Sequence, residues 1–234
     1  MATTTAPTDQ PEAEETNKYY GFSVIFAGIR GLFRGFLPFL VVIVVNAIVQ
    51  AVLIGTLNAL PGFNPSFIIS LIISVASLWI GLYFLCQTAL ATPFGRVSLG
   101  QGTRLHGRGL LTFTVWVVVL YAVLMILLIL YVPLGLLWLV VTPFTVLAAA
   151  DAKANAIGAN FRVIGSRFFR WLITIIILSI LLLFVYLIQV AFGFFIGSWL
   201  GSGLGWIVNG VIAAWFLSSL AALYRSTPVG RRQE

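Results

Sequence analysis

Charged side chains are scarce in this chain: they make up 8% of its 234 residues, against roughly 25% in soluble domains. Hydrophobic residues make up 61%. They gather in uninterrupted runs longer than about 18 residues, the length that a helix needs to cross a membrane. The composition excludes an ordinary soluble protein. Because the runs are continuous rather than alternating, they also exclude a β-barrel and favour membrane-spanning helices.

The chain has one cysteine, Cys86, and one histidine, His106. A single cysteine forms no intramolecular disulfide and supplies no cysteine-rich zinc site. His106 has no base, nucleophile or metal partner nearby in the sequence, so a Ser-His-Asp triad cannot be assembled from it and Asp151. It suits a solvated loop position or contact with a phosphate headgroup. We therefore expect no catalytic residue, no metal and no cofactor.

Six apolar runs predict an all-α, polytopic membrane protein, a six-helix bundle built from three helical hairpins. The fourth run is the shortest, and Pro143 interrupts it, so a kink is expected there. The segment 193–205 has a glycine at every fourth position, which suits either a turn between the last two spans or a helix-packing face; we favour the turn. The expected spans are residues 37–57, 66–91, 110–131, 134–150, 171–192 and 205–224.

The polar ends flank this membrane domain, which takes in residues 19–225. Residues 1–18 are rich in Thr, Pro and Ala and carry four acidic residues, which predicts a disordered tail. They contain no apolar run, so we expect no cleavable signal peptide. Residues 226–234 form a short C-terminal tail.

All thirteen lysines and arginines fall in segments that six spans place on one side of the membrane. The three turns on the opposite side carry no charge. By the positive-inside rule the basic side is cytoplasmic, so both termini are predicted there. The net charge of +7 then reflects topology and contact with anionic lipid headgroups, and nucleic acid is not expected as a partner.

A basic amphipathic segment precedes each hairpin. Residues 19–35 predict a helix on the membrane surface, with aromatic and aliphatic residues on one face and arginines on the other. A shift of 74 residues aligns residues 30–49 with 104–123 at nine identities, and a looser third copy lies in 151–171, with apolar residues at helical spacing. We interpret these as three tandem units related by rotation about the membrane normal. The arginines expected to contact headgroups are Arg30, Arg34, Arg104, Arg108, Arg162, Arg167 and Arg170.

No Asp, Glu, Lys, Arg or His lies inside a predicted span. Ion-coupled transporters usually keep such a residue at depth, so this absence counts against proton or sodium coupling. Five amide side chains do lie in the spans, where they suit hydrogen bonds between helices, with a cavity lining as the alternative. They are Asn46, Gln50, Gln87, Gln189 and Asn209.

Asp151 is the one acidic residue of the membrane domain. It follows the fourth span, where it can pair with an arginine such as Arg162 or Arg167, or with the start of the next short helix. We expect it to hold the loops on the basic side together. A lipid-headgroup or partner contact is the alternative.

Several short motifs follow the fourth span: an acidic residue, an alanine and a polar residue, an Arg-aromatic-aromatic-Arg run, and Leu-Tyr-Arg after the last span. They are Asp151, Ala156, Asn160, Arg167–Arg170 and Leu223–Arg225. Through these motifs the chain from Pro143 to Arg225 resembles the membrane domain of glycerophosphoryl diester phosphodiesterases. This membrane domain is fused to some of these enzymes, but it more often occurs alone, in prokaryotic multi-pass membrane proteins. Asp151 stands where Glu is commoner in that family, and Asn160 where Ser is. The catalytic domain is absent, so the resemblance implies a six-helix membrane module, with Asp151 and Asn160 organising its loops.

The sequence thus predicts a non-catalytic protein of a prokaryotic cytoplasmic membrane. The leading hypothesis is an accessory, scaffolding or assembly subunit that contacts anionic lipids and a protein partner, or forms a homo-oligomer. The alternative is a transporter or channel for lipids or small molecules without a titratable residue in the membrane. A cavity lined by the five amides would favour transport. A pocket shared by His106 and Asp151 would favour a third hypothesis, a membrane-embedded enzyme.

Overall fold

The computed structural model describes residues 23–57, 65–195 and 198–230, and within these ranges the chain forms helices and no strand. The long apolar helices have 22 to 28 residues, or about 33 to 42 Å at 1.5 Å per residue, which exceeds a hydrocarbon core of about 30 Å. The described chain is therefore all-helical, and these helices are long and apolar enough to cross a membrane. Four of them are candidate spans: α3 (Phe36–Leu57), α4 (Pro65–Ala91), α6 (Gly107–Leu130) and α11 (Ser198–Arg225).

A fifth candidate span is a bent pair. α9 (Ala156–Ser166) and α10 (Phe168–Phe195) meet at an angle of 102°. The spacing of the apolar residues in the third copy, from Ile157 to Trp171, predicts one continuous helix. The structure differs, because the chain turns at Arg167. Gly165 and Ser166, which end α9, are weak helix formers. Within the described ranges the count is four spans, or five with this pair, and the six-span prediction is not confirmed.

The predicted fourth span, residues 134–150, is broken into α7 (Val132–Val141) and α8 (Thr145–Ala150). Pro143 lies in the break, where it has no N–H to donate and its ring obstructs the preceding turn. The ten residues of α7 rise only about 15 Å, half of the hydrocarbon core. Neither piece crosses a membrane alone.

Asn160, on α9, closes this break. Its Nδ2 donates to the carbonyl of Val141 at 2.8 Å, and its Oδ1 accepts from the N–H of Phe144 at 2.9 Å. The side chain is fully buried. Because buried backbone groups that leave a helix need new partners, Asn160 stabilises the break and fixes α9 against α8.

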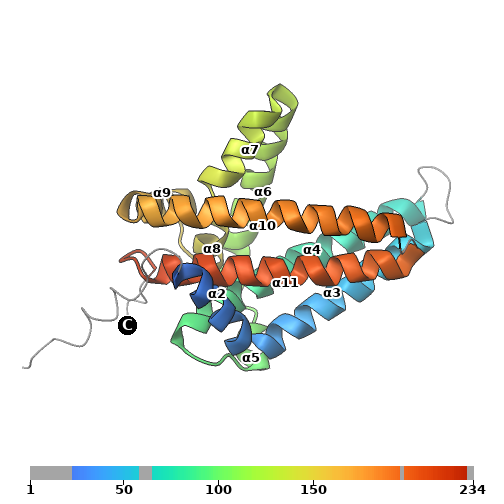
Figure 1. Ribbon diagram of the computed structural model, residues 1–234, viewed down its shortest axis with the longest axis horizontal. Coiled ribbons are helices and arrows are strands. Elements are labelled where there is room, and N and C mark those ends of the chain that lie inside the picture. Colours follow the sequence, from blue (N-terminus) through green and yellow to red (C-terminus); the bar gives the residue numbers. More distant parts are fainter. Residues whose placement is uncertain (1–22, 58–64, 196–197, 231–234) are drawn as a thin grey trace, which may run out of the picture.

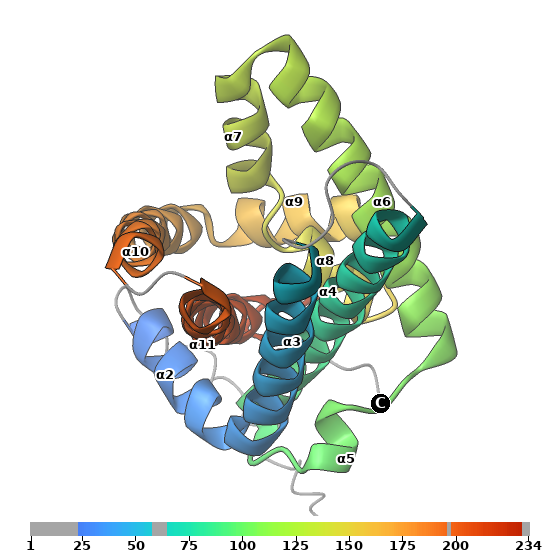
Figure 2. The same cartoon turned by 90° about the vertical axis from the view of Figure 1, so that its right-hand side faces the viewer.

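The helices are arranged as hairpins that meet at one end (Figure 1). α10 lies beside α11 in antiparallel orientation, and α3 packs against both α4 and α11. The α6–α7 hairpin projects away from the rest in both ribbon views (Figure 2). We call the end at which the hairpins meet the basic end. It is formed by α2 (Ser23–Arg34), α5 (Leu99–Gly102), α8, α9 and the adjoining ends of α4, α6 and α11.

The surface helix predicted over residues 19–35 is seen as α2, and residues 19–22 lie outside the described ranges. α2 packs on α11 through a third face that the sequence pattern did not reveal. Val24, Gly28 and Gly31 are buried there, and a Cβ on Gly28 would collide with Ser219 of α11. The exposed Phe33 lies on another face. The glycines allow the close approach of α2 to α11.

The predicted turn at 193–205 is shorter than expected. α10 continues to Phe195 and α11 begins at Ser198, so most of the glycine-rich segment is helical, with Gly201 and Gly205 buried. Glycine is well tolerated in membrane helices. Residues 1–22 and 231–234, with the predicted tails, and the connections at 58–64 and 196–197 lie outside the described residues.

The first two copies of the repeat present the same pair of residues to α4. Phe39 is 2% exposed and its counterpart Phe113 is 0% exposed. A Cβ on Gly35 would touch Phe39 and Thr88 of α4, and one on Gly109 would approach the hydroxyl of Tyr83, also on α4. The ring centroids of Phe113 and Tyr83 lie 5.2 Å apart. The shared residues therefore include core contacts that seat each copy on the same helix.

Candidate functional site

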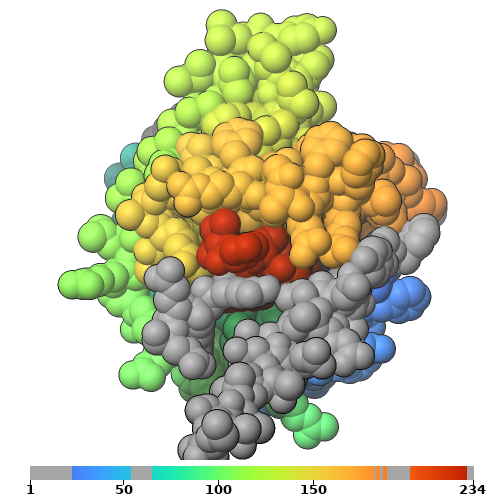
Figure 3. All heavy atoms as spheres, turned by 90° about the vertical axis from the view of Figure 1, so that its left-hand side faces the viewer, coloured from blue at the N-terminus to red at the C-terminus, as the bar shows by residue number. Residues whose placement is uncertain are grey.

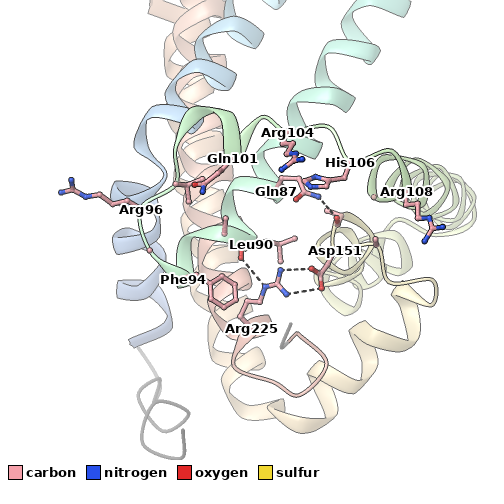
Figure 4. Close-up of a pocket in the computed structure, with 16 residues that line it drawn as sticks. Gln87, Leu90, Phe94, Arg96, Gln101, Arg104, His106, Arg108, Asp151 and Arg225 are labelled. Atoms are coloured by element: carbon pink, nitrogen blue, oxygen red, sulfur yellow. Dashed lines mark hydrogen bonds and ion pairs between the residues drawn. The ribbon is translucent and has the colours of Figure 1, made fainter. Parts of the chain in front are cut away.

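A cavity of about 650 Å³ opens at the basic end, between the ends of α4, α6, α8 and α11 (Figure 4). Its volume is in the range of small-molecule sites. Figure 3, which looks at this end, shows the end of α11 recessed beneath α9 and the start of α10. The polar side chains that line the cavity are Gln87, Arg96, Gln101, Arg104, His106, Arg108, Asp151 and Arg225.

The loop between α4 and α6 forms one wall of the cavity, and its turns are locally determined. A 3₁₀ turn, η1 (Thr92–Phe94), ends α4 at Pro93. Gly95 follows with φ of +148°, a conformation that glycine adopts readily. Ser98 and Gln101 form a capping box that starts α5. These features fix the backbone that carries Arg96 and Arg104.

An ion pair between Asp151 and Arg225 forms the floor. Nη2 of Arg225 donates to Oδ1 of Asp151 at 2.8 Å, and Nη1 donates to Oδ2 at 3.3 Å. Arg225 also donates to the carbonyls of Gly230 at 2.6 Å and Leu90 at 3.4 Å. The hydroxyl of Tyr224 donates to Oδ2 of Asp151 at 3.1 Å. The guanidinium and the carboxylate are thus matched to each other and to the backbone.

Asp151 pairs with an arginine, as predicted, but not with either of the two arginines that were named. Its carboxylate pairs with Arg225, and more distantly with Lys153 at 3.9 Å, rather than with Arg162 or Arg167. Arg162 is exposed on α9, and Arg167 lies at the bend after it. The end of α8 instead meets the end of α11, so Asp151 joins two chain segments that are 74 residues apart.

The three other arginines of the lining have no carboxylate partner within the described ranges. Arg96, Arg104 and Arg108 are exposed. Asp151 is the one acidic residue between 23 and 230, and Arg225 already holds it. Four arginines and one aspartate give the lining a formal charge of +3 with His106 neutral. The cavity is therefore suited to an anion.

The N-terminus of α6 adds to this positive potential. His106 is its N-cap residue, and no side chain caps the first turn. A Cβ on Gly107 would meet only open space, so the backbone there is accessible. Unpaired N–H groups and the helix dipole both favour a negative charge at such an end.

His106 and Asp151 both line the cavity, which is the arrangement set out above for an enzyme. Both carboxylate oxygens of Asp151 accept from Arg225, so this group is poorly placed to act as a base. Among the residues that line the cavity there is no hydroxyl or thiol side chain to act as a nucleophile. The described residues also include no cluster of three metal-ligating side chains.

The intramembrane amides mostly join helices. Ser77 on α4 donates to Oδ1 of Asn46 on α3 at 2.9 Å, and Ser74 donates to Oε1 of Gln50 at 2.7 Å. Gln87 donates to the carbonyl of Ala150 at 2.6 Å, and it is the one member of the set that lines the cavity. Asn209 is half-buried on α11, and the side chain of Gln189 is outside the described part of the chain.

The remaining predicted arginines lie around the basic end. Arg34 donates to the carbonyls of Thr92 and Pro93, at 3.2 and 3.4 Å, where α4 ends. With Arg30 it lines a second cavity of only about 40 Å³. Arg170 is half-buried near the start of α10. Only Arg104 and Arg108 of the seven predicted arginines line the larger cavity.

Two charged residues that line this cavity, Arg96 and Arg225, were not among the predicted site residues. Arg96 belongs to the same glycine-rich basic loop as Arg104, and Arg225 closes the Leu-Tyr-Arg motif, so composition gave a signal for both. No protein-family model, curated protein or solved structure matches the chain.

Proposed function

We propose that the protein binds an anionic lipid headgroup in the cavity at its basic end and works without catalysis, as an accessory or scaffolding subunit of a membrane complex. The observation that carries this proposal is the set of three exposed arginines without a carboxylate partner in the described part of the chain. Basic pockets at the ends of membrane helices attract phosphate headgroups, because the guanidinium matches phosphate in charge and geometry.

The orientation is part of the same proposal. The basic end faces the cytoplasm of a prokaryote by the positive-inside rule, with both termini on that side. A six-pass arrangement requires α7 and α8 to cross as one broken segment and α9–α10 to act as a bent span. The two hydrogen bonds of Asn160 at the break support this, since a broken membrane helix needs such partners. We also propose that the chain from Pro143 to Arg225 is related to the membrane domain of glycerophosphoryl diester phosphodiesterases.

Transport of a lipid or small anionic molecule is the second candidate. The volume of the cavity favours it, because about 650 Å³ exceeds what one small ion needs. Asn46 and Gln50 speak against a polar path through the membrane, since both pair with serines of α4. We therefore rank binding above transport.

Native mass spectrometry of the full chain in mild detergent tests the proposal. With phosphatidylglycerol and phosphatidylcholine added in equal amounts, we expect the anionic lipid to be retained preferentially. The variant Arg104→Gln/Arg108→Gln should weaken its binding roughly 30-fold, since each arginine near the surface contributes about 1 kcal/mol. The variant Arg30→Gln/Arg162→Gln removes the same charge from exposed positions outside this cavity and should bind as the parent does.

Equal retention of the two lipids would contradict the proposal, as would equal losses in the two variants. The same spectra report any protein that stays bound in a fixed ratio. Such a protein would identify the complex in which this subunit serves.

A further inference from the structure

We propose that the cavity at the basic end selects a terminal phosphate, a phosphomonoester, over a phosphodiester. This inference rests on the proposed function, because it specifies which anionic headgroup the same site prefers. It follows from the charge of the lining, the placement of the donors and the uncapped end of α6.

The charge of the lining exceeds that of a phosphodiester. The formal charge of +3 stands against −1 for a diester such as phosphatidylglycerol. A monoester carries about −1.5 to −2 at neutral pH. The carboxylate of Asp151 does not balance the other three arginines, because it is already paired with Arg225 at 2.8 Å. The more highly charged group leaves fewer guanidinium groups without an anionic partner.

The donors come from separate parts of the chain. Arg96 lies on the loop after η1, Arg104 lies between α5 and α6, and Arg108 lies in the first turn of α6. In Figure 4 the side chain of Arg104 is directed toward Gln87 and His106, whereas Arg96 and Arg108 point outward on opposite sides. A monoester offers three terminal oxygens to such donors, and a diester offers only two.

The first turn of α6 offers a further place for a doubly charged group. Its amides have no side-chain cap, and the position of Gly107 leaves the backbone open. Helix N-termini bind phosphate through exposed N–H groups and the helix dipole, and the attraction grows with the charge of the group. The arginines and the helix end line one cavity. Arg96 and Arg108 are exposed, so their side chains are free to turn toward a ligand that is bound beside Arg104.

Binding of three probes to the purified full chain separates the possibilities. Dioctanoyl phosphatidic acid carries the monoester on acyl chains, dioctanoyl phosphatidylglycerol carries a diester, and sn-glycerol 3-phosphate carries the monoester alone. We expect phosphatidic acid to bind at least about tenfold more tightly than phosphatidylglycerol, the effect of one further charge-assisted hydrogen bond. Dioctanoyl phosphatidylcholine gives the baseline.

Each outcome decides between the claims. Equal affinity for the two anionic lipids, both above the baseline, would overturn the monoester preference and leave the proposed function standing. No binding above the baseline would overturn both. If glycerol 3-phosphate binds as tightly as phosphatidic acid, the preference is upheld, and the ligand is a soluble phosphomonoester rather than a lipid.

Two variants tie the preference to this cavity. Arg104→Gln/Arg108→Gln should abolish the preference, so that phosphatidic acid and phosphatidylglycerol bind this variant equally. Arg30→Gln/Arg162→Gln should retain the preference. His106→Asp caps α6 with a carboxylate, which favours the helix, and places a negative charge in the cavity. It should keep or raise the melting temperature while abolishing the preference. Full preference in a folded His106→Asp protein would refute the inference.

Discussion

Replacing Asp151 with Asn tests the ion pair at the floor of the cavity, because the change removes the charge and keeps the shape of the side chain. The carboxylate accepts two hydrogen bonds from Arg225 and one from Tyr224. The side chains of Arg225 and Asp151 are only 7% and 17% exposed, so water replaces the lost partner poorly. Removal of one member of a buried pair destabilises a protein by about 3–5 kcal/mol.

We expect the lower end of that range, about 3 kcal/mol, for Asp151→Asn. In this variant Arg225 still donates hydrogen bonds to the carbonyls of Leu90 and Gly230, and its guanidinium still lies beside the ring of Phe94, 5.5 Å from the ring centroid. For a chain of this size each kcal/mol shifts the melting temperature by roughly 2–4 °C, so the expected decrease is about 6–12 °C.

Thermal unfolding of the purified protein in detergent, followed by tryptophan fluorescence, measures this decrease. Arg225→Gln should be less harmful, because the carboxylate of Asp151 still accepts a hydrogen bond from Tyr224 and still lies 3.9 Å from the ammonium group of Lys153. The double variant buries no uncompensated charge, so it should be more stable than the sum of the single effects by at least about 1 kcal/mol. Additive effects, or an unchanged melting temperature for Asp151→Asn, would refute this account of the pair.

Three further predictions concern contacts between helices. Asn160→Ala leaves two buried backbone groups unpaired at the α7–α8 break and should destabilise the protein by about 2–5 kcal/mol. The control Asn155→Ala removes only the exposed cap of α9 and should lower the stability by about 1 kcal/mol. Equal melting temperatures of the two variants would contradict the role of Asn160. Gly28→Val should separate α2 from α11 and expose α2 to limited proteolysis, and Gly165→Val, where a Cβ meets open space, should not; the same cleavage pattern in both would show that α2 is not held by close packing. Gln50→Leu should lower stability by only about 0.6 kcal/mol, the average for a hydrogen bond between membrane helices, and a loss several times larger would indicate a role beyond its contact with Ser74.

The membrane helices could be predicted because each carries its signal within its own residues. α3, α4 and α6 follow apolar runs that are long enough to satisfy their backbone internally. The break at Pro143 was visible in the same way, as a kink. The hydrogen bonds that stabilise the break were not visible, because Asn160 lies on another helix. It is 16 residues from Phe144, whose N–H it accepts from, and 19 residues from Val141, whose carbonyl it donates to.

The site was less predictable, because it depends on which loops meet. The six-span prediction puts all the arginines on one side of the membrane, but it says nothing about how they pair. Asp151 could reach several of them, and the packing of α8 against the end of α11 selects Arg225. The cavity likewise arises only when the loop before α6 and the ends of α4, α8 and α11 come together.

The first two copies of the repeat place their arginines in different surroundings. Arg30 and Arg34 lie on α2, which packs tightly on α11, and Arg34 donates to the backbone at the end of α4. The cavity beside them has room for about one water molecule or a small ion, at about 40 Å³. Arg104 and Arg108 occupy the equivalent positions, but their segment forms a loop and a helix start instead of a packed helix. The same sequence pattern therefore places Arg34 against the backbone at the end of α4 in the first copy, and places both arginines in the larger cavity in the second.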